Sequence, residues 1–311
     1  MLRQPVARRL FRVVRFLIGA AVVVLLLRQL AEIGLKEVWD SRPRTPWFYI
    51  IWVVLYVQLM LVELAIYSRL WPVSARDLWP VLFRKRVLNS DLVNYSGEAY
   101  FFLWAQRRVP HPTRQILGTI KDNAIASTIG SWSSALVLLG VFLYTGQIEL
   151  VDLLGKATPV YVGVGLVLGA VAVSLMAMFR RSILTLPTRT VLTLAAVHAG
   201  RFLFVIYILQ IVQWWVVLPD APLSVWATML VILTIANRLP LIPAKDILGA
   251  GAVLGVSSVL SASEPVIAAI LMTHMALNKT ANLVLFAGTS LGERLRRRSG
   301  EGLPAASFPS E

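Results

Sequence analysis

The sequence has 311 residues, of which 57% are hydrophobic and 15% are charged, and its mean hydropathy is +0.72. Soluble domains carry about a quarter charged residues, so this composition excludes a soluble globular protein and indicates an integral membrane protein. The chain has no cysteine, which excludes disulfides and thiolate metal ligands, and its formal net charge of +14 is explained by Lys and Arg flanking membrane spans rather than by nucleic-acid binding.

The N-terminal part of the chain begins with a basic segment and two apolar spans. Arginines surround an apolar run at residues 16–27, and no small-residue cleavage site follows it. This pattern indicates a signal anchor, with a first span at about residues 11–30, rather than a cleaved signal peptide. Residues 47–68 form the second predicted span, which starts with the aromatic residues typical of a membrane interface and holds Glu63 in its interior.

A long basic stretch follows the second span and contains the first break in the apolar pattern. Lys and Arg between Arg69 and Lys121 flank an apolar and aromatic section, residues 92–104, on both of its sides. Because basic flanks stay on the cytoplasmic side, we expect this section to enter and leave on that side, as a re-entrant or interfacial helical hairpin. Gly97 and Glu98 lie at its break.

The remainder of the chain adds six predicted spans and a basic C-terminal end. The predicted fold class is therefore all-α: a single polytopic transmembrane domain over residues 1–298, with about eight spans plus the hairpin. The positive-inside rule places both termini in the cytoplasm, with residues 299–311 as a disordered tail, and we expect a bacterial inner membrane. The six spans cover residues 122–144, 160–179, 190–218, 221–237, 247–260 and 265–291.

A second broken stretch lies between the sixth and seventh predicted spans. It holds Pro240 and Pro243 between Arg238 and Asp246. Each proline removes a backbone donor and disfavours helix at the residue before it. Broken backbone is tolerated at membrane depth only where protein buries it or where it lines a polar cavity. Two acid-bearing breaks in one chain suggest an inverted repeat, from which many transporters build a site near the membrane midplane.

Ionisable side chains inside predicted spans mark candidate sites, because a charge at the bilayer centre costs about 2.5 to 3.5 kcal/mol on insertion scales. Arg201 lies well inside the fifth span, and a polar stripe on the eighth span contains Asn278 and Lys279. We expect the headgroup of an anionic lipid to bind between these two spans. The predicted substrate-binding residues are Glu98, Arg201, Arg238, Asp246, Asn278 and Lys279, and the predicted structural breaks are Gly97, Pro240 and Pro243.

Structural alternatives remain open at this point. Buried ion pairs of Glu63 or Asp246 with Arg201 or Lys279 would explain the intramembrane charges, and hydrogen bonds between helices would explain the polar stripe. No metal-binding, nucleotide-binding or nucleophile motif occurs in the sequence. The sequence therefore predicts no cofactor and no metal, and it leaves enzymatic activity open.

Both broken segments resemble motifs of one known family. At residues 94–98 an asparagine and small residues lead into a Gly–Glu pair, and an aromatic helix and a basic end at 107–108 follow. Later, the proline-rich segment 239–243 is followed by Gly249. These segments resemble the flippase-like membrane domain of lysylphosphatidylglycerol synthases. The second segment departs from the family pattern, because residues 244–246 stand where that family usually shows glycines, and the nearest charged pair is Lys245–Asp246 rather than Arg–Glu.

The resemblance implies a stand-alone membrane domain that translocates lipid, since no soluble aminoacyl-transferring domain follows residue 298. It carries Glu98, Pro240, Pro243 and Asp246 over as site residues. The leading hypothesis is thus a lipid translocase that moves a phospholipid or a lipid-linked headgroup between leaflets. A membrane-embedded lipid-modifying transferase and a non-catalytic membrane scaffold are the alternatives. The oligomeric state stays open, with a homo-oligomer among the options.

Overall fold

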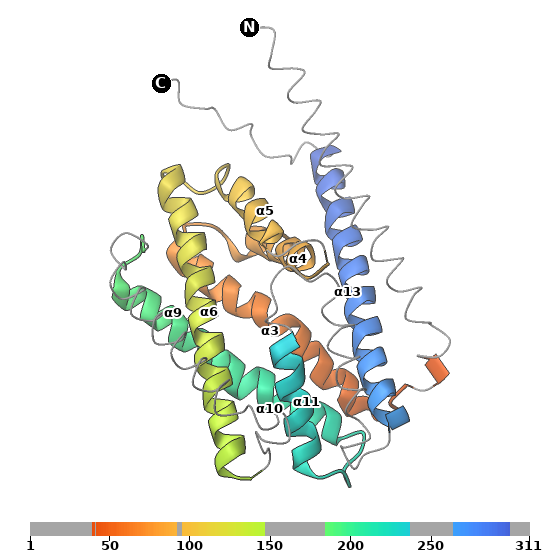
Figure 1. The fold of residues 1–311 in the computed structure, drawn as a ribbon. Helices are drawn as coiled ribbons and strands as arrows, with labels where there is room; N and C mark the ends of the chain where they lie inside the picture. The colour runs from red at the N-terminus through yellow and green to blue at the C-terminus, as the bar shows by residue number, and fades with distance from the viewer. Residues whose placement is uncertain (1–38, 41, 92–94, 147–183, 237–263, 299–311) are drawn as a thin grey trace, which may run out of the picture.

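The computed structural model describes residues 39–40, 42–91, 95–146, 184–236 and 264–298. The predicted first, fourth and seventh spans, the break at 237–246 and the tail lie outside these residues. In the described part every regular element is a helix, which confirms the all-α fold class. The helices are α3 (Pro46–Leu70), α4 (Ala75–Asp91), α5 (Ser96–Ala105), α6 (Thr113–Tyr144), α9 (Thr188–Gly200), the π-helix η2 (Arg201–Tyr207), α10 (Ile208–Trp215), α11 (Leu223–Ala236) and α13 (Glu264–Arg298) (Figure 1).

Local signals set where several helices begin. α3 starts at Pro46, and α6 and α9 directly follow Pro112 and Pro187. Proline is well tolerated at a helix start, because the first backbone N–H groups have no partner inside the helix. α4 begins with a side-chain cap instead, since the Ser74 hydroxyl accepts the Asp77 N–H at 3.3 Å and donates to its carboxylate at 2.8 Å.

Three helical segments are long and apolar enough to cross a membrane: α3, α6, and the continuous α9–η2–α10 segment from Thr188 to Trp215. They correspond to the second, third and fifth predicted spans and support a membrane protein. The described residues establish three such segments rather than eight. α6 begins at Thr113, earlier than the predicted start at 122, because Arg114 and Lys121 project from its exposed side and no further proline follows Pro112 in the helix.

The direction of each helix follows from its successive contacts. Near its start, α6 places the Asp122 carboxylate against the Leu186 N–H at 2.6 Å, and further on the Ser134 hydroxyl donates to the Ala199 carbonyl oxygen at 3.0 Å. Residue numbers rise together along both segments, so α6 and α9 are parallel. A Cβ at Gly130 would lie 2.6 Å from a backbone oxygen of α9, which shows how closely the two helices approach.

α3 runs in the opposite direction to this pair. Its Gln58 accepts a hydrogen bond from Arg201, while its earlier carbonyl at Phe48 accepts one from Gln213 at 3.0 Å. Residue numbers therefore fall along α3 as they rise along α9–η2–α10. Consequently the C-terminal end of α3 and the beginning of α6 lie at the same end of the bundle, as Figure 1 shows.

α4 and α5 form a helical hairpin at that end. The Ser96 hydroxyl donates to the Leu88 carbonyl oxygen at 2.8 Å, and the Gly97 N–H donates to Asn89 Oδ1 at 2.7 Å. The hairpin predicted at residues 92–104 is thus only the returning arm. The outgoing arm is α4, whose Lys and Arg the sequence assigns to a basic flank. Its residues Arg84, Lys85 and Asp91 are instead buried, and each contacts a neighbouring helix.

The hairpin reaches the middle of the bundle. Its residue Arg84 contacts Thr289 near the end of α13, and Asp91 contacts Lys279, in the middle of that 35-residue helix. α13 itself runs parallel to α3. Trp52 donates a hydrogen bond to Asn278, and one turn later on both helices Tyr56 donates one to Asn282. The hairpin tip therefore lies level with the centre of a candidate membrane span.

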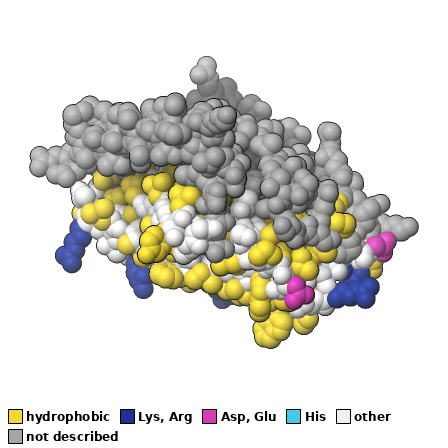
Figure 2. All heavy atoms as spheres, turned by 60° about the horizontal axis from the view of Figure 1, so that its bottom comes forward, with side chains coloured by type: hydrophobic (Ala, Val, Ile, Leu, Met, Phe, Trp, Pro, Cys, Tyr) yellow, Lys and Arg dark blue, Asp and Glu magenta, His cyan; other side chains and the backbone are white. Residues whose placement is uncertain are grey.

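Large apolar side chains cover the outside of the candidate spans. Figure 2 shows one face of the molecule on which hydrophobic side chains spread across the described surface, with Lys, Arg and acids at its margins. Apolar surface of this extent is unfavourable in water and suits contact with lipid chains. Exposed examples are Ile50, Val53 and Leu61 on α3, Leu136 and Val141 on α6, and Phe204 and Ile208 on η2–α10.

We predict that Gly97→Ala separates the two arms of the hairpin. A Cβ there would lie 2.1 Å from the Lys85 carbonyl oxygen and 2.6 Å from Asn89 Oδ1, and overpacking of this kind costs about 1 to 3 kcal/mol. Thermal unfolding in detergent, followed by tryptophan fluorescence, measures the loss. Gly140→Ala on α6 is the matched control, because no described atom lies within 4 Å of its Cβ position. Equal stability of the two variants would contradict the close packing.

Candidate functional site

A first cluster of charges joins α3, α4 and α5. Lys85 on α4 forms an ion pair with Glu63 on α3, and its Nζ lies 3.6 Å from a carboxylate oxygen of Glu98 on α5. The ammonium group also lies 5.7 and 5.5 Å from the ring centroids of Tyr67 and Phe101. Two carboxylates and two aromatic faces thus surround one cation, which offsets the cost of burying Lys85.

A second cluster joins the hairpin tip to α13 and α3. Asp91 forms an ion pair with Lys279, and each of the two residues is 5% exposed. The Asn282 amide donates to the second Asp91 oxygen at 2.6 Å and to Ser90 at 3.1 Å, and its carbonyl oxygen accepts the Tyr56 hydroxyl at 2.6 Å. Both oxygens of the buried carboxylate therefore have a partner, as a charge in an apolar bundle requires.

The fifth predicted span contains the π-helix η2, which begins at Arg201. π-helical turns are rare and occur frequently at functional sites. Arg201 is buried; its guanidinium donates to Gln58 Oε1 at 2.9 Å and lies 4.2 Å from the Phe202 ring centroid. The arginine thus orients a polar side chain of α3.

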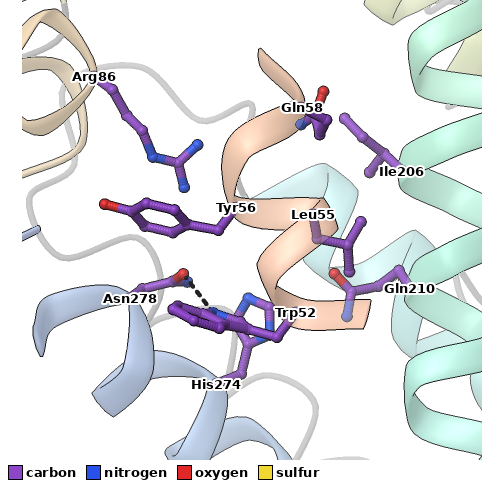
Figure 3. Close-up of a pocket in the computed structure, with 9 residues that line it drawn as sticks. All are labelled: Trp52, Leu55, Tyr56, Gln58, Arg86, Ile206, Gln210, His274 and Asn278. Atoms are coloured by element: carbon purple, nitrogen blue, oxygen red, sulfur yellow. Dashed lines mark hydrogen bonds between the residues drawn. The ribbon is translucent and has the colours of Figure 1, made fainter. Parts of the chain in front are cut away.

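A polar pocket of about 100 Å³ lies where α3, α4, η2–α10 and α13 meet. In Figure 3 the side chains from these helices surround a common space, with Arg86 above the Tyr56 ring and the Trp52–Asn278 hydrogen bond at one wall. The guanidinium carbon of Arg86 lies 4.2 Å from the Tyr56 ring centroid. The polar lining residues are Gln58, Arg86, Gln210, His274 and Asn278, and the others are Trp52, Leu55, Tyr56 and Ile206.

The predicted site residues do not form one cluster. Asn278 lines the pocket between the fifth and eighth predicted spans, whereas Lys279 faces the hairpin and pairs with Asp91. Arg201 bonds Gln58, which in turn lines the pocket. Glu98 belongs to the Lys85 cluster, and Gly97 lies at the predicted break, where α5 packs against α4. The predicted residues Arg238, Pro240, Pro243 and Asp246 lie outside the described residues.

Sequence reasoning missed three charged residues of this region. Lys85, Arg86 and Asp91 all lie on α4, where we had treated Lys and Arg as a solvated flank and had not counted Asp91 among the available acids. A helical-spacing test would have found Lys85, because it shares a face with the buried Leu78, Leu82 and Leu88. The alternative of buried ion pairs is confirmed for Glu63 and Lys279, but with partners other than those expected. Glu63 pairs with Lys85, and Lys279 pairs with Asp91.

No family model, curated protein or solved structure matches the chain. The family resemblance therefore rests on the short motifs alone and stays a prediction. Within the described helices, no group of three His, Asp or Glu residues is arranged to hold a metal ion. The chemistry offered by this region is hydrogen bonding and ion pairing by fixed side chains.

We predict that Lys279→Gln destabilises the protein by about 3 to 5 kcal/mol, because it leaves the Asp91 carboxylate buried without its cation. The double variant Asp91→Asn with Lys279→Gln should recover most of this loss, since neutral amides keep hydrogen bonds to Asn282. Thermal unfolding in detergent compares the variants.

Lys121→Gln is the control for this pair. Lys121 is 43% exposed on its side chain, so water screens its attraction to the buried Asp122, 3.4 Å away. The Asp122 carboxylate also keeps hydrogen bonds from the Thr185 and Leu186 N–H groups, so we expect a smaller loss than for Lys279→Gln. A double variant no more stable than Lys279→Gln alone would show that Asp91 and Lys279 do not compensate each other.

Proposed function

We propose that this chain is a lipid translocase, which passes the phosphate-bearing headgroup of an anionic lipid between leaflets while the acyl chains stay in the bilayer. The observation that carries the proposal is the polar pocket, lined by an arginine, three carboxamides and a histidine, at the level of the centre of α3. A polar pocket at this depth is costly in an apolar bundle unless a polar group uses it.

The hairpin supports the same proposal. Lys85 and Asp91 lie at different depths along α4, and each is neutralised by partners from other helices. Polar groups thus extend from the end of the bundle to its middle without leaving either charge uncompensated. A headgroup can move along such a surface at lower free-energy cost than through lipid, because polar groups of the protein replace the water molecules that hydrogen-bond it in solution.

Arg86 is the pocket cation that we assign to the headgroup phosphate. Its guanidinium lies against the Tyr56 ring, which leaves its planar N–H groups in one orientation and suits bidentate binding of phosphate oxygens. Arg76 is on the same helix but is exposed near its start. The two residues therefore provide a matched pair of substitutions.

The test is leaflet exchange of labelled lipids in liposomes that contain the purified protein. We predict exchange by the wild-type protein of a lipid with an anionic headgroup. We further predict at least a tenfold slower exchange for Arg86→Gln, because a hydrogen bond to a charged group contributes about 1.5 to 3 kcal/mol and about 1.4 kcal/mol is tenfold. Arg76→Gln should exchange lipid at the wild-type rate.

Chemical analysis of the same lipids distinguishes the alternatives. Exchange no faster than in protein-free liposomes would overturn the translocase proposal. A modified lipid would then select a lipid-modifying transferase, and unmodified, unmoved lipid would select a membrane scaffold. Equal exchange by Arg86→Gln and Arg76→Gln would remove the pocket from the transport path.

A further inference from the structure

The three carboxamides that line the pocket have forced orientations. An indole N–H and a guanidinium can only donate hydrogen bonds. Trp52 donates to Asn278 Oδ1 at 3.0 Å, and Arg201 donates to Gln58 Oε1 at 2.9 Å. The oxygens of both amides are therefore engaged by the protein, and the ends that remain for the pocket are the NH₂ groups of Asn278 and Gln58.

Gln210 is fixed in the opposite sense. A backbone carbonyl can only accept, so Gln213 must direct its NH₂ group toward the Phe48 carbonyl oxygen, at 3.0 Å. Its own oxygen then accepts from the Gln210 NH₂ group at 2.8 Å. The end of Gln210 that remains for the pocket is its carbonyl oxygen. Flipping any of the three amides would lose a hydrogen bond inside the protein.

The pocket consequently presents a defined set of groups. It offers donors from Asn278, Gln58 and the Arg86 guanidinium, an acceptor from Gln210, and the His274 ring, which can donate or accept. None of its described lining residues is acidic. Donors outnumber acceptors, and Arg86 is the charged residue among the described lining residues, so the complementary group is an anion with several acceptor oxygens and a hydroxyl that donates to Gln210.

We propose that the pocket selects phospholipids whose phosphodiester carries a hydroxylated group, such as glycerol or a sugar, and no ammonium group. This inference rests on the proposed function for its lipid source, but its hydrogen-bond argument concerns binding alone. An ammonium headgroup, including a lysylated one, would meet the Arg86 charge, and among the three carboxamides only Gln210 would offer it an oxygen. A choline headgroup has no donor for Gln210 at all.

The size of the pocket agrees with a phosphate and its adjoining hydroxyl. A volume of about 100 Å³ is well above the roughly 10 to 15 Å³ that a cavity needs to hold one water molecule. A phosphodiester group fits this space, while the rest of a larger headgroup would extend beyond it. Selection would therefore act on the phosphate and its nearest hydroxyl rather than on the identity of a distant sugar.

The test is native mass spectrometry of the purified full-length chain with phosphatidylglycerol, phosphatidylethanolamine and phosphatidylcholine at equal concentrations. We predict that the wild-type protein retains phosphatidylglycerol at least tenfold better than either zwitterionic lipid. Asn278→Asp is isosteric and keeps an oxygen for Trp52, but it replaces the pocket donor by an anionic acceptor. We predict that this variant reverses the preference in favour of phosphatidylethanolamine.

Gln115→Glu is the matched control, because it adds the same charge at an exposed position on α6 and should keep the wild-type preference. Soluble glycerophosphoglycerol, which has the headgroup without acyl chains, distinguishes the source of the ligand. Competition at low concentration would assign the pocket to a free phosphodiester, and its absence would assign it to the lipid. Either result keeps the hydrogen-bond assignment.

Equal retention of the three lipids by the wild-type protein would overturn the inference. An unchanged preference in folded Asn278→Asp would overturn it too. These results are distinguishable from a failure of the proposed function. Selective retention without leaflet exchange would contradict the translocase proposal and support the lipid site, whereas leaflet exchange without selective retention would support the translocase and contradict the lipid site.

Discussion

The buried ion pair between Asp91 and Lys279 is the interaction on which the described architecture depends. It lies at the tip of the α4–α5 hairpin, level with the centres of α3 and α13. An isolated charge at this depth would be expelled toward water or neutralised, so neither of these two charges can remain among the spans without the other. Asn282 extends the pair to Tyr56, and this connects the hairpin tip to a wall of the pocket.

The pocket follows from the same constraint. α4 is held against α3 by Lys85 and against α13 by Asp91, and the next residue after Lys85 is Arg86, which reaches the pocket over the Tyr56 ring. On the opposite side, η2 begins at Arg201 and orients Gln58. The groups that stabilise the hairpin and the groups that line the pocket are therefore neighbours in sequence and in space, and movement of the hairpin would change both.

The helical fold and the places of α3, α6 and the α9–η2–α10 segment were predictable, because apolar length marks spans. The start of α6 was placed at 122 instead of 113, because the prediction did not use Pro112 as a helix-start signal. Asn278 was found from its place on a polar stripe. The sequence did not predict that Asn278 lines a pocket together with Arg86. Arg86 lies on α4, and only tertiary packing shows which charges of a basic stretch are buried. The structure does not bring Arg201 and Lys279 into one site, for the same reason. Arg201 donates to Gln58, and Lys279 pairs with Asp91.

The central claim is that the α4–α5 hairpin enters the bundle and returns to the end where it started. The chain has no cysteine, so single cysteines can be labelled with membrane-impermeant reagents in oriented vesicles. Suitable exposed positions are Arg76, in the first turn of α4, and Arg114, after α5. We expect both positions to label from the same side, and a cysteine at Tyr144, the last residue of α6, to label from the other. Labelling of Arg76→Cys and Arg114→Cys from opposite sides would contradict it.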